Sequence, residues 1–250
     1  MVAAIFIAFC GGLMLGSFVT VVGYRVPRGE SIVGPRSRCT TCGAGIAAYD
    51  NIPVVSWAVL RGRSRCCGDP ISARYPLTEL SLAGLWAATV AVLWGDPFEI
   101  ALGLAFVTTL LAVTLTDLDR RVIPNRILLV AAAVGVSLIV VGDPSSLAER
   151  TAAALGAGGA FFLVALAYPR GMGLGDVKLA ALMGLYLGRE VAPAILVALL
   201  AGSAVGLILI AREGASARKR AIPFGPFLAF GGVVGLLAGG QLIDWYLAAF

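Results

Sequence analysis

Long apolar runs alternate with short polar segments along most of the 250-residue chain. Many of the runs approach the roughly 20 residues that a helix needs to cross the hydrocarbon layer of a membrane. A backbone in lipid must satisfy its own hydrogen bonds, so such runs are expected to be helices. We find eight, near residues 2–24, 77–94, 98–116, 125–142, 148–168, 177–189, 191–211 and 227–248. The sixth and seventh are short enough to form a re-entrant pair.

This pattern predicts an all-α membrane protein, a polytopic bundle of about eight transmembrane helices. One long polar segment interrupts it after the first run, and this segment carries four of the five cysteines. We therefore divide the chain into a first transmembrane helix (1–24), a small cytosolic cysteine-containing insert (25–76) and a seven-helix core (77–250). No internal repeat is evident.

Composition supports the membrane interpretation, because 59% of the residues are hydrophobic and only 13% are charged. In soluble domains about half of the residues are hydrophobic and about a quarter are charged. A net charge of +5 in a soluble protein would suggest nucleic acid. Here the basic residues lie in short loops, so we expect the lipid bilayer and no nucleic acid as a partner. Histidine is absent, which excludes Ser-His-Asp and Cys-His catalysis and histidine-ligated metals.

The basic residues also predict the orientation of the helices. If the amino terminus lies outside, 17 of the 19 Lys and Arg residues fall on the inner side, and only Arg150 and Arg189 remain outside. Loops rich in Lys and Arg stay in the cytosol. We therefore expect a multi-pass inner-membrane protein, with the cysteine insert in the cytosol.

Two aspartates lie at the predicted cytosolic helix ends. Asp117 directly follows an apolar run, and Asp176 ends the segment Gly171-Met-Gly-Leu-Gly-Asp176 just before another. Ionisable groups at membrane depth need a partner or water. Two close carboxylates can share one proton, so that one polarises a peptide carbonyl while the other activates water. The glycines of this segment are expected to permit close backbone approach and a positive φ.

Each acid also has a simpler interpretation. Asp176 could cap the helix that follows it. Asp117 could be an interfacial acid paired with Arg120 or Arg121. Asp119, two residues further on, is expected to be solvated. From the residues alone, these alternatives stay open beside the catalytic one.

Seven motifs are spread in order over nearly the whole chain. They are Leu-Gly-Ser17-Phe-Val-Thr-Val-Val-Gly-Tyr-Arg25-Val-Pro, Cys39-Thr-Thr-Cys42-Gly, Tyr49-Asp-Asn-Ile-Pro-Val-Val-Ser-Trp57, Ile71-Ser-Ala-Arg-Tyr-Pro-Leu-Thr-Glu79-Leu, Asp117 with Ile123-Pro-Asn, Gly173-Leu-Gly-Asp-Val-Lys178 and Ile222-Pro-Phe-Gly-Pro226. Together they resemble the type IV prepilin peptidase family.

The resemblance implies a bifunctional enzyme, whose two catalytic aspartates fall on Asp117 and Asp176. Such enzymes are aspartyl endopeptidases that cut the leader peptide of prepilins or pseudopilins on the cytosolic side. Many then methylate the new amino terminus with S-adenosylmethionine as the methyl donor. A peptidase that has lost its methyltransferase half is the alternative.

The resemblance also implies a zinc site made of two Cys-x-x-Cys pairs. The first pair is Cys39 and Cys42, but the second has Ser64 in its first position and Cys67 in its second. Cys66 could supply the fourth sulfur, although adjacent side chains seldom converge on one tetrahedral ion. We expect zinc bound by Cys39, Cys42, Cys67 and Cys66. The alternative is a loop held by its own packing, and a disulfide is not expected in the cytosol.

The methyltransferase half has a weaker basis in the sequence. Thr20 replaces an asparagine that the family often carries, and no glycine-rich nucleotide-binding motif is present. Glu79, at the inner end of the second run, is our candidate for the cofactor or amine site. It could equally be an interfacial acid paired with Arg74. Methylation is therefore expected from the resemblance alone.

Two other classes of protein deserve comparison. A small proton-coupled transporter also has glycine-broken helices and buried acids. Its acids would lie near the membrane midplane, whereas here they follow or precede the apolar runs. A non-catalytic scaffold for pilus assembly has no need of two acids at facing helix ends.

Overall fold

The structure is a computed structural model that describes residues 1–34, 37–39, 41–169, 171–214 and 222–249. Throughout these ranges regular secondary structure is helical, apart from two isolated β-bridges in the cysteine insert. Five charges that contributed to the predicted orientation lie outside the described residues, namely Arg36, Arg170, Arg218, Lys219 and Arg220.

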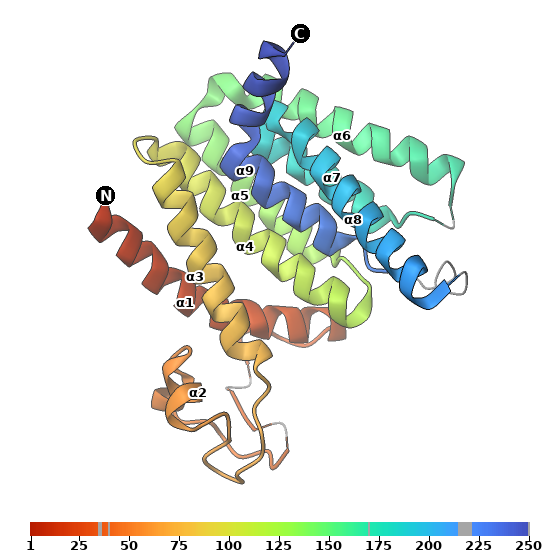
Figure 1. Ribbon diagram of the computed structural model, residues 1–250. Coiled ribbons are helices and arrows are strands. Elements are labelled where there is room, and N and C mark those ends of the chain that lie inside the picture. Colours follow the sequence, from red (N-terminus) through yellow and green to blue (C-terminus); the bar gives the residue numbers. More distant parts are fainter. Residues whose placement is uncertain (35–36, 40, 170, 215–221, 250) are drawn as a thin grey trace. The chain divides into compact units, whose positions relative to one another are not determined.

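Each of the eight predicted runs contains a helix (Figure 1). These helices are α1 (Val2–Arg25), α3 (Arg74–Val92), α4 (Pro97–Arg120), α5 (Asn125–Gly142), α6 (Leu147–Ala167), α7 (Leu174–Leu187), α8 (Val191–Glu213) and α9 (Gly225–Ala248). The short helix α2 (Val55–Val59) lies in the cysteine insert, with 3₁₀ turns at Val26–Arg28, Ala48–Asn51, Pro144–Ser146 and Gly188–Glu190. The all-α membrane fold is thus confirmed.

Six segments are long and apolar enough to cross a membrane. They are Val2–Arg28, Pro97–Arg120, Asn125–Gly142, Pro144–Ala167, Leu174–Glu213 and Gly225–Ala248. Helix α3 is not among them, and α7 and α8 form one apolar stretch of 40 residues. Eight separate crossings therefore remain a prediction, as does the re-entrant pair.

The chain forms two compact units, Met1–Trp94 and Gly95–Phe250. Helix α3 belongs structurally with α1 and the cysteine insert. The functional division into a first helix, a cysteine insert and a peptidase core from residue 77 stays a prediction.

In the first unit α1 packs against α3 through glycines spaced four residues apart. A Cβ atom built on Gly12 would lie 2.6 Å from the Cα atom of Ala83, and one on Gly16 would lie 2.7 Å from that of Glu79. Helix pairs in membranes use small residues in this way, because close backbone approach replaces the hydrophobic driving force that lipid removes.

The second unit is a bundle of α4 to α9 in which α6 packs on α7, α8 on α9, and α4 on both α5 and α9 (Figure 1). Its centre includes Phe106 of α4, whose ring stacks on Tyr186 of α7 with centroids 5.0 Å apart. The Tyr186 hydroxyl donates to the carbonyl oxygen of Ala131 in α5 at 2.7 Å. Since this hydroxyl finds a partner, the aromatic contact joins three helices without leaving a polar atom unsatisfied.

Candidate active site

Asp117 lies in the last turn of α4 and is buried, with 6% of its surface exposed. Its Oδ2 atom accepts a hydrogen bond from the backbone N–H of Gly225, the first residue of α9, at 2.8 Å. Arg121, in the left-handed conformation, ends α4, and its backbone N–H donates to the Asp117 carbonyl. Arg121 also acts electrostatically on the Asp117 carboxylate, but the hydrogen bond that this carboxylate accepts comes from Gly225.

Asp176 is the third residue of α7, and Gly173 is the N-cap. Its carboxylate accepts a hydrogen bond from the Gly173 backbone N–H, as in a capping box. The helix-capping interpretation is therefore correct in part. The same carboxylate interacts electrostatically with Asp117, so the fold brings together the two acids predicted from the sequence.

The glycines of this segment serve close approach rather than an unusual backbone conformation. A Cβ atom on Gly173 would lie 3.3 Å from Asp176 Oδ2, and one on Gly175 would lie 3.0 Å from the Cβ atom of Ile123. The expected positive φ is wrong, since Gly173 has φ −80° and none of the three glycines is in the left-handed region. Gly173 and Gly175 are therefore required for their small size and not for their conformational freedom.

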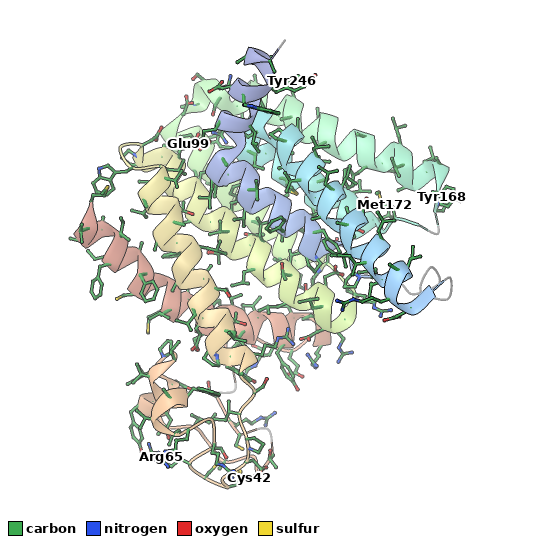
Figure 2. The ribbon with its side chains drawn as sticks, in the orientation of Figure 1. Cys42, Arg65, Glu99, Tyr168, Met172 and Tyr246 are labelled. Atoms are coloured by element: carbon green, nitrogen blue, oxygen red, sulfur yellow. The ribbon has the colours of Figure 1, made fainter. Side chains whose placement is uncertain are left out.

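A polar contact joins the starts of α5 and α7 beside the aspartates. Lys178 Nζ donates to Asn125 Oδ1 at 2.9 Å. Three segments that are distant in sequence, around Asp117, Asp176 and Gly225, thus meet at one end of the bundle. Figure 2 shows Met172, in the loop just before α7, towards one end of the bundle and Glu99, in the first turn of α4, towards the other.

Four thiols meet in the cysteine insert of the first unit. The Sγ atoms of Cys39, Cys42, Cys66 and Cys67 all lie within 4.8 Å of one another. The Sγ atoms of Cys42 and Cys66 lie 3.3 Å apart, and those of Cys39 and Cys67 lie 3.7 Å apart. Tetrahedral zinc with Zn–S bonds of about 2.3 Å requires sulfurs about 3.8 Å apart. The donor set therefore fits a tetrahedral thiolate-bound metal.

Two turns of matching geometry bring these thiols together. The Gly43 amide donates to the Cys39 carbonyl at 3.0 Å, and 25 residues later the Gly68 amide donates to the Ser64 carbonyl at 2.9 Å. Both glycines are left-handed, with φ of 73° and 74°. The insert thus contains two copies of one turn, with Ser64 in the place of Cys39, as the two-pair pattern of the family resemblance implies.

The fourth sulfur comes from a different position of the second turn. The Ser64 hydroxyl lies 3.0 Å from the Cys67 Sγ atom, and the Cys66 Sγ atom lies 4.0 Å from it. The adjacent Cys66 and Cys67 thus reach one cluster, as expected, although adjacent side chains seldom converge on one site. An ion pair braces the turn, because Arg65 binds the Asp50 carboxylate through Nε and Nη2 at 2.9–3.1 Å. Figure 2 shows Cys42 and Arg65 together in the cysteine insert.

The local hydrogen bonds set the protonation of two of the thiols. Backbone N–H groups of Cys42 and Thr41 lower the pKa of the Cys39 thiol to about 6, so Cys39 is ionised at neutral pH. A hydrogen bond with the Cys42 thiol raises the pKa of Cys66 to about 12. The pKa values of these two thiols are therefore shifted in opposite directions by the groups around them.

Glu79 is buried between α3, α1 and the cysteine insert, with 6% of its surface exposed. Its Oε2 atom accepts from the backbone N–H of Val54 at 2.7 Å, and its carboxylate is also hydrogen-bonded to Ser17. Val54 has φ +60°, which is strained for a β-branched residue. Thr20, one turn after Ser17, bonds its own helix at the Gly16 carbonyl.

Comparison with known proteins places this chain among leader peptidases. The family described as "Type IV leader peptidase family" matches residues 104–211, and "Bacterial Peptidase A24 N-terminal domain" matches residues 10–93. A prepilin leader peptidase/N-methyltransferase of Aeromonas hydrophila is 34% identical over 98% of this chain and 94% of its own length. One of Bacillus subtilis is 33% identical over 96% and 97%. No solved structure matches the chain.

The chain belongs to the type IV leader peptidase family. It is thus an enzyme, a multi-pass membrane peptidase. The N-terminal family domain falls within the first compact unit of the peptidase, and the leader peptidase domain falls within the second. Gly225, which holds Asp117, lies beyond both matched ranges.

Some contacts of the peptidase were missed in the sequence. Gly225 and Val54 act through backbone N–H groups, which leave no signal in residue type. Their motifs, Ile222-Pro-Phe-Gly-Pro226 and the segment Tyr49–Trp57, were noticed only as parts of the family resemblance. Ser17 also belongs to such a motif, and its contact with Glu79 depends on how α1 crosses α3.

Proposed function

We propose that this peptidase is an aspartyl endopeptidase in which Asp117 and Asp176 are the catalytic pair. The observation that carries this assignment is that the two carboxylates, from two helices far apart in sequence, lie near enough at one end of the bundle to interact electrostatically. The absence of histidine supports it, because acid–base hydrolysis then falls to carboxylates.

The chemistry follows from two carboxyl groups that share one proton. The ionised carboxylate takes a proton from water while the water oxygen attacks the peptide carbonyl carbon. The protonated carboxyl group donates its proton to the carbonyl oxygen. When the resulting diol collapses, the leaving nitrogen takes the proton that the first carboxyl group now holds, the second carboxylate takes a proton from a diol hydroxyl, and the products are a carboxylic acid and a free amine. One carboxylate ends protonated and the other ionised, so the pair is ready for another cycle.

The substrate we propose is the leader peptide of a prepilin or pseudopilin. The names of the relatives support this substrate, and the sorting of basic residues supports cleavage at the cytosolic face of the bacterial inner membrane. A proton-coupled transporter is less well supported, because both acids lie at helix ends.

Carboxamide substitutions test the catalytic pair. Asp117→Asn and Asp176→Asn should each lower leader cleavage by on the order of 10²–10⁴-fold, since an amide cannot exchange the proton. Asp119→Asn, two residues along and exposed, is the matched control and should cleave normally. Cleavage is followed by the mobility shift of a co-expressed prepilin, and membrane insertion by fractionation. Retained cleavage in both catalytic variants would exclude this mechanism.

We further propose that Glu79 serves N-methylation of the new amino terminus, with S-adenosylmethionine supplying the methyl group. Its buried carboxylate between α1, α3 and Val54 could hold a cationic group, and the relatives are named N-methyltransferases. Glu79→Gln keeps the shape but removes the charge, so methylation should fall about tenfold or more while cleavage continues. Mass spectrometry of the processed pilin measures both, and a fully methylated product would contradict the role.

The four thiols Cys39, Cys42, Cys66 and Cys67 are proposed to hold a structural zinc ion, which would cross-link the two turns of the insert. Their spacing supports a tetrahedral site, and all four positions are occupied by protein sulfur, which is typical of a structural rather than a catalytic metal.

A further inference from the structure

The backbone N–H of Gly225, in the first turn of α9, finds its partner outside the helix. The first N–H groups of a helix have no acceptor within it. Here the amides of Phe227 and Leu228 donate to the Phe224 carbonyl at 3.0 and 3.1 Å, and Pro226 has no N–H. The remaining amide, that of Gly225, donates to Asp117 Oδ2 at 2.8 Å.

The carboxylate lies so close that only glycine fits at this position. A Cβ atom on Gly225 would lie 2.7 Å from Asp117 Oδ2 and 3.1 Å from its Cγ atom. Contacts below 3.0 Å force something to shift, and the flexible partner is the carboxylate itself. Any side chain at position 225 would therefore displace Asp117.

The backbone on the other side of this contact is held firmly. The Phe224 ring stacks on Phe161 with centroids 6.4 Å apart and lies 6.2 Å from that of Phe227. Leu228 is completely buried. Because large side chains lock the start of α9, its amide is a fixed donor against which the carboxylate aligns.

We propose that Gly225 is a positioning residue for the catalytic pair: its N–H fixes Asp117 Oδ2 as an acceptor and leaves Oδ1 for water and the shared proton. This inference rests on the proposed function. It adds the start of α9, which is outside the matched family ranges, to the active site.

A pair of glycine substitutions in the full-length enzyme tests the proposal. In Gly225→Ala the displaced carboxylate should lower kcat for leader cleavage by about 10²-fold, the usual effect of a misplacement near 1 Å, with little change in KM. Gly232→Ala is the matched control, because its Cβ atom would lie 2.9 Å from Leu110 Cδ1 of the same helix α4, among apolar groups. Its kcat per folded molecule should stay near that of the unsubstituted enzyme.

Equal kcat values for the two variants would overturn the positioning role. If Asp117→Asn and Asp176→Asn abolish cleavage while Gly225→Ala does not, the catalytic assignment stands and only this inference fails. The pH profile of kcat gives a second readout, which should change in Gly225→Ala and not in Gly232→Ala.

Hydrogen exchange tests the contact even if Gly225→Ala fails to fold. In Asp117→Ala the Gly225 amide loses its acceptor and should exchange faster than in the unsubstituted protein. The amides of Phe227 and Leu228, bonded within the helix, should be unchanged and serve as internal controls. Unchanged exchange at Gly225 would show that its amide does not depend on Asp117.

Discussion

At the scale of single residues, the cysteine insert brings four thiols together although Ser64 stands where the family pattern has a cysteine. Ser64 occupies the repeat position of Cys39, and its hydroxyl lies 3.0 Å from the Cys67 sulfur. Serine is a poor zinc ligand, but here its hydroxyl lies within hydrogen-bonding distance of the Cys67 thiol. Cys66, two positions later in the turn, brings its sulfur to 3.3 Å from that of Cys42. The turn therefore keeps four sulfurs although its spacing has changed.

Exchanging the two side chains tests this replacement. Cys66→Ser leaves three sulfurs and should lose stoichiometric zinc, whereas Ser64→Cys/Cys66→Ser restores the regular spacing and should recover it. Zinc is measured by elemental analysis of the purified protein, and Co²⁺ spectra report the number of thiolates. Normal zinc in Cys66→Ser would mean that Cys66 is not a ligand.

How far the sequence specifies the site depends on how each contact is made. The positions of Asp117 and Asp176 at helix ends could be predicted, because charged side chains beside apolar runs are costly and conspicuous. The partners of Glu79 could not: the sequence suggested Arg74, and the structure gives Ser17 and the amide of Val54. Backbone donors depend on where distant segments meet, which no local pattern encodes.

At the scale of helices, one buried cation joins the two helices that carry the aspartates. Arg150, in the first turn of α6, bonds Glu99 at the start of α4 and the carbonyl of Tyr186 near the end of α7. Its Nε atom also donates to Ser146 at 3.2 Å. Arg150 thus bonds the ends of α4 and α7 that are opposite to the ends carrying Asp117 and Asp176. Arg150, one of two basic residues on the predicted outer side, thus has a structural reason to be there.

Replacing this cation should destabilise the bundle. Arg150→Met leaves Glu99 and the Tyr186 carbonyl without their partner, which should cost about 3 kcal/mol of unfolding free energy. Arg189→Met is the matched control, because Arg189 pairs with Glu190 at the surface and should contribute less than about 1 kcal/mol. Denaturant unfolding in detergent measures both. Equal stability of the two variants would show that burial of the Arg150 pair has no consequence.

The positions of the helices were predicted better than their number of membrane crossings. Apolar runs located all eight long helices because lipid requires both apolar side chains and internally bonded backbone. Crossings are harder, since α7 has 14 residues and is only about 21 Å long at 1.5 Å per residue. Its packing against α6 depends on Gly184, where a Cβ atom would lie 2.5 Å from the Ala153 carbonyl oxygen. Hydropathy does not record such contacts.

At the scale of the whole molecule, the two sets of candidate functional groups belong to different compact units. The four thiols and Glu79 come from Met1–Trp94, and Asp117, Asp176 and Gly225 come from Gly95–Phe250. No thiol of the cluster comes from the second unit among the described residues. A metal bound by this cluster would therefore stabilise the first unit directly, because binding free energy adds to the folding of the segment that supplies the ligands.

Metal removal should consequently affect the two units differently. Chelation of the full-length protein should open the cysteine insert. Trypsin should then cut faster after three residues of the insert, all of them exposed: Arg61, Arg63 and Arg65. Leader cleavage, which we propose depends on Asp117 and Asp176, should persist at close to its initial rate, while N-methylation should fall as the surroundings of Glu79 loosen. Proteolysis followed by mass spectrometry, together with both activity assays on the same sample, distinguishes these effects. Loss of cleavage in parallel with loss of metal would show that the aspartates depend on the insert, and the division of labour between the units would then be wrong.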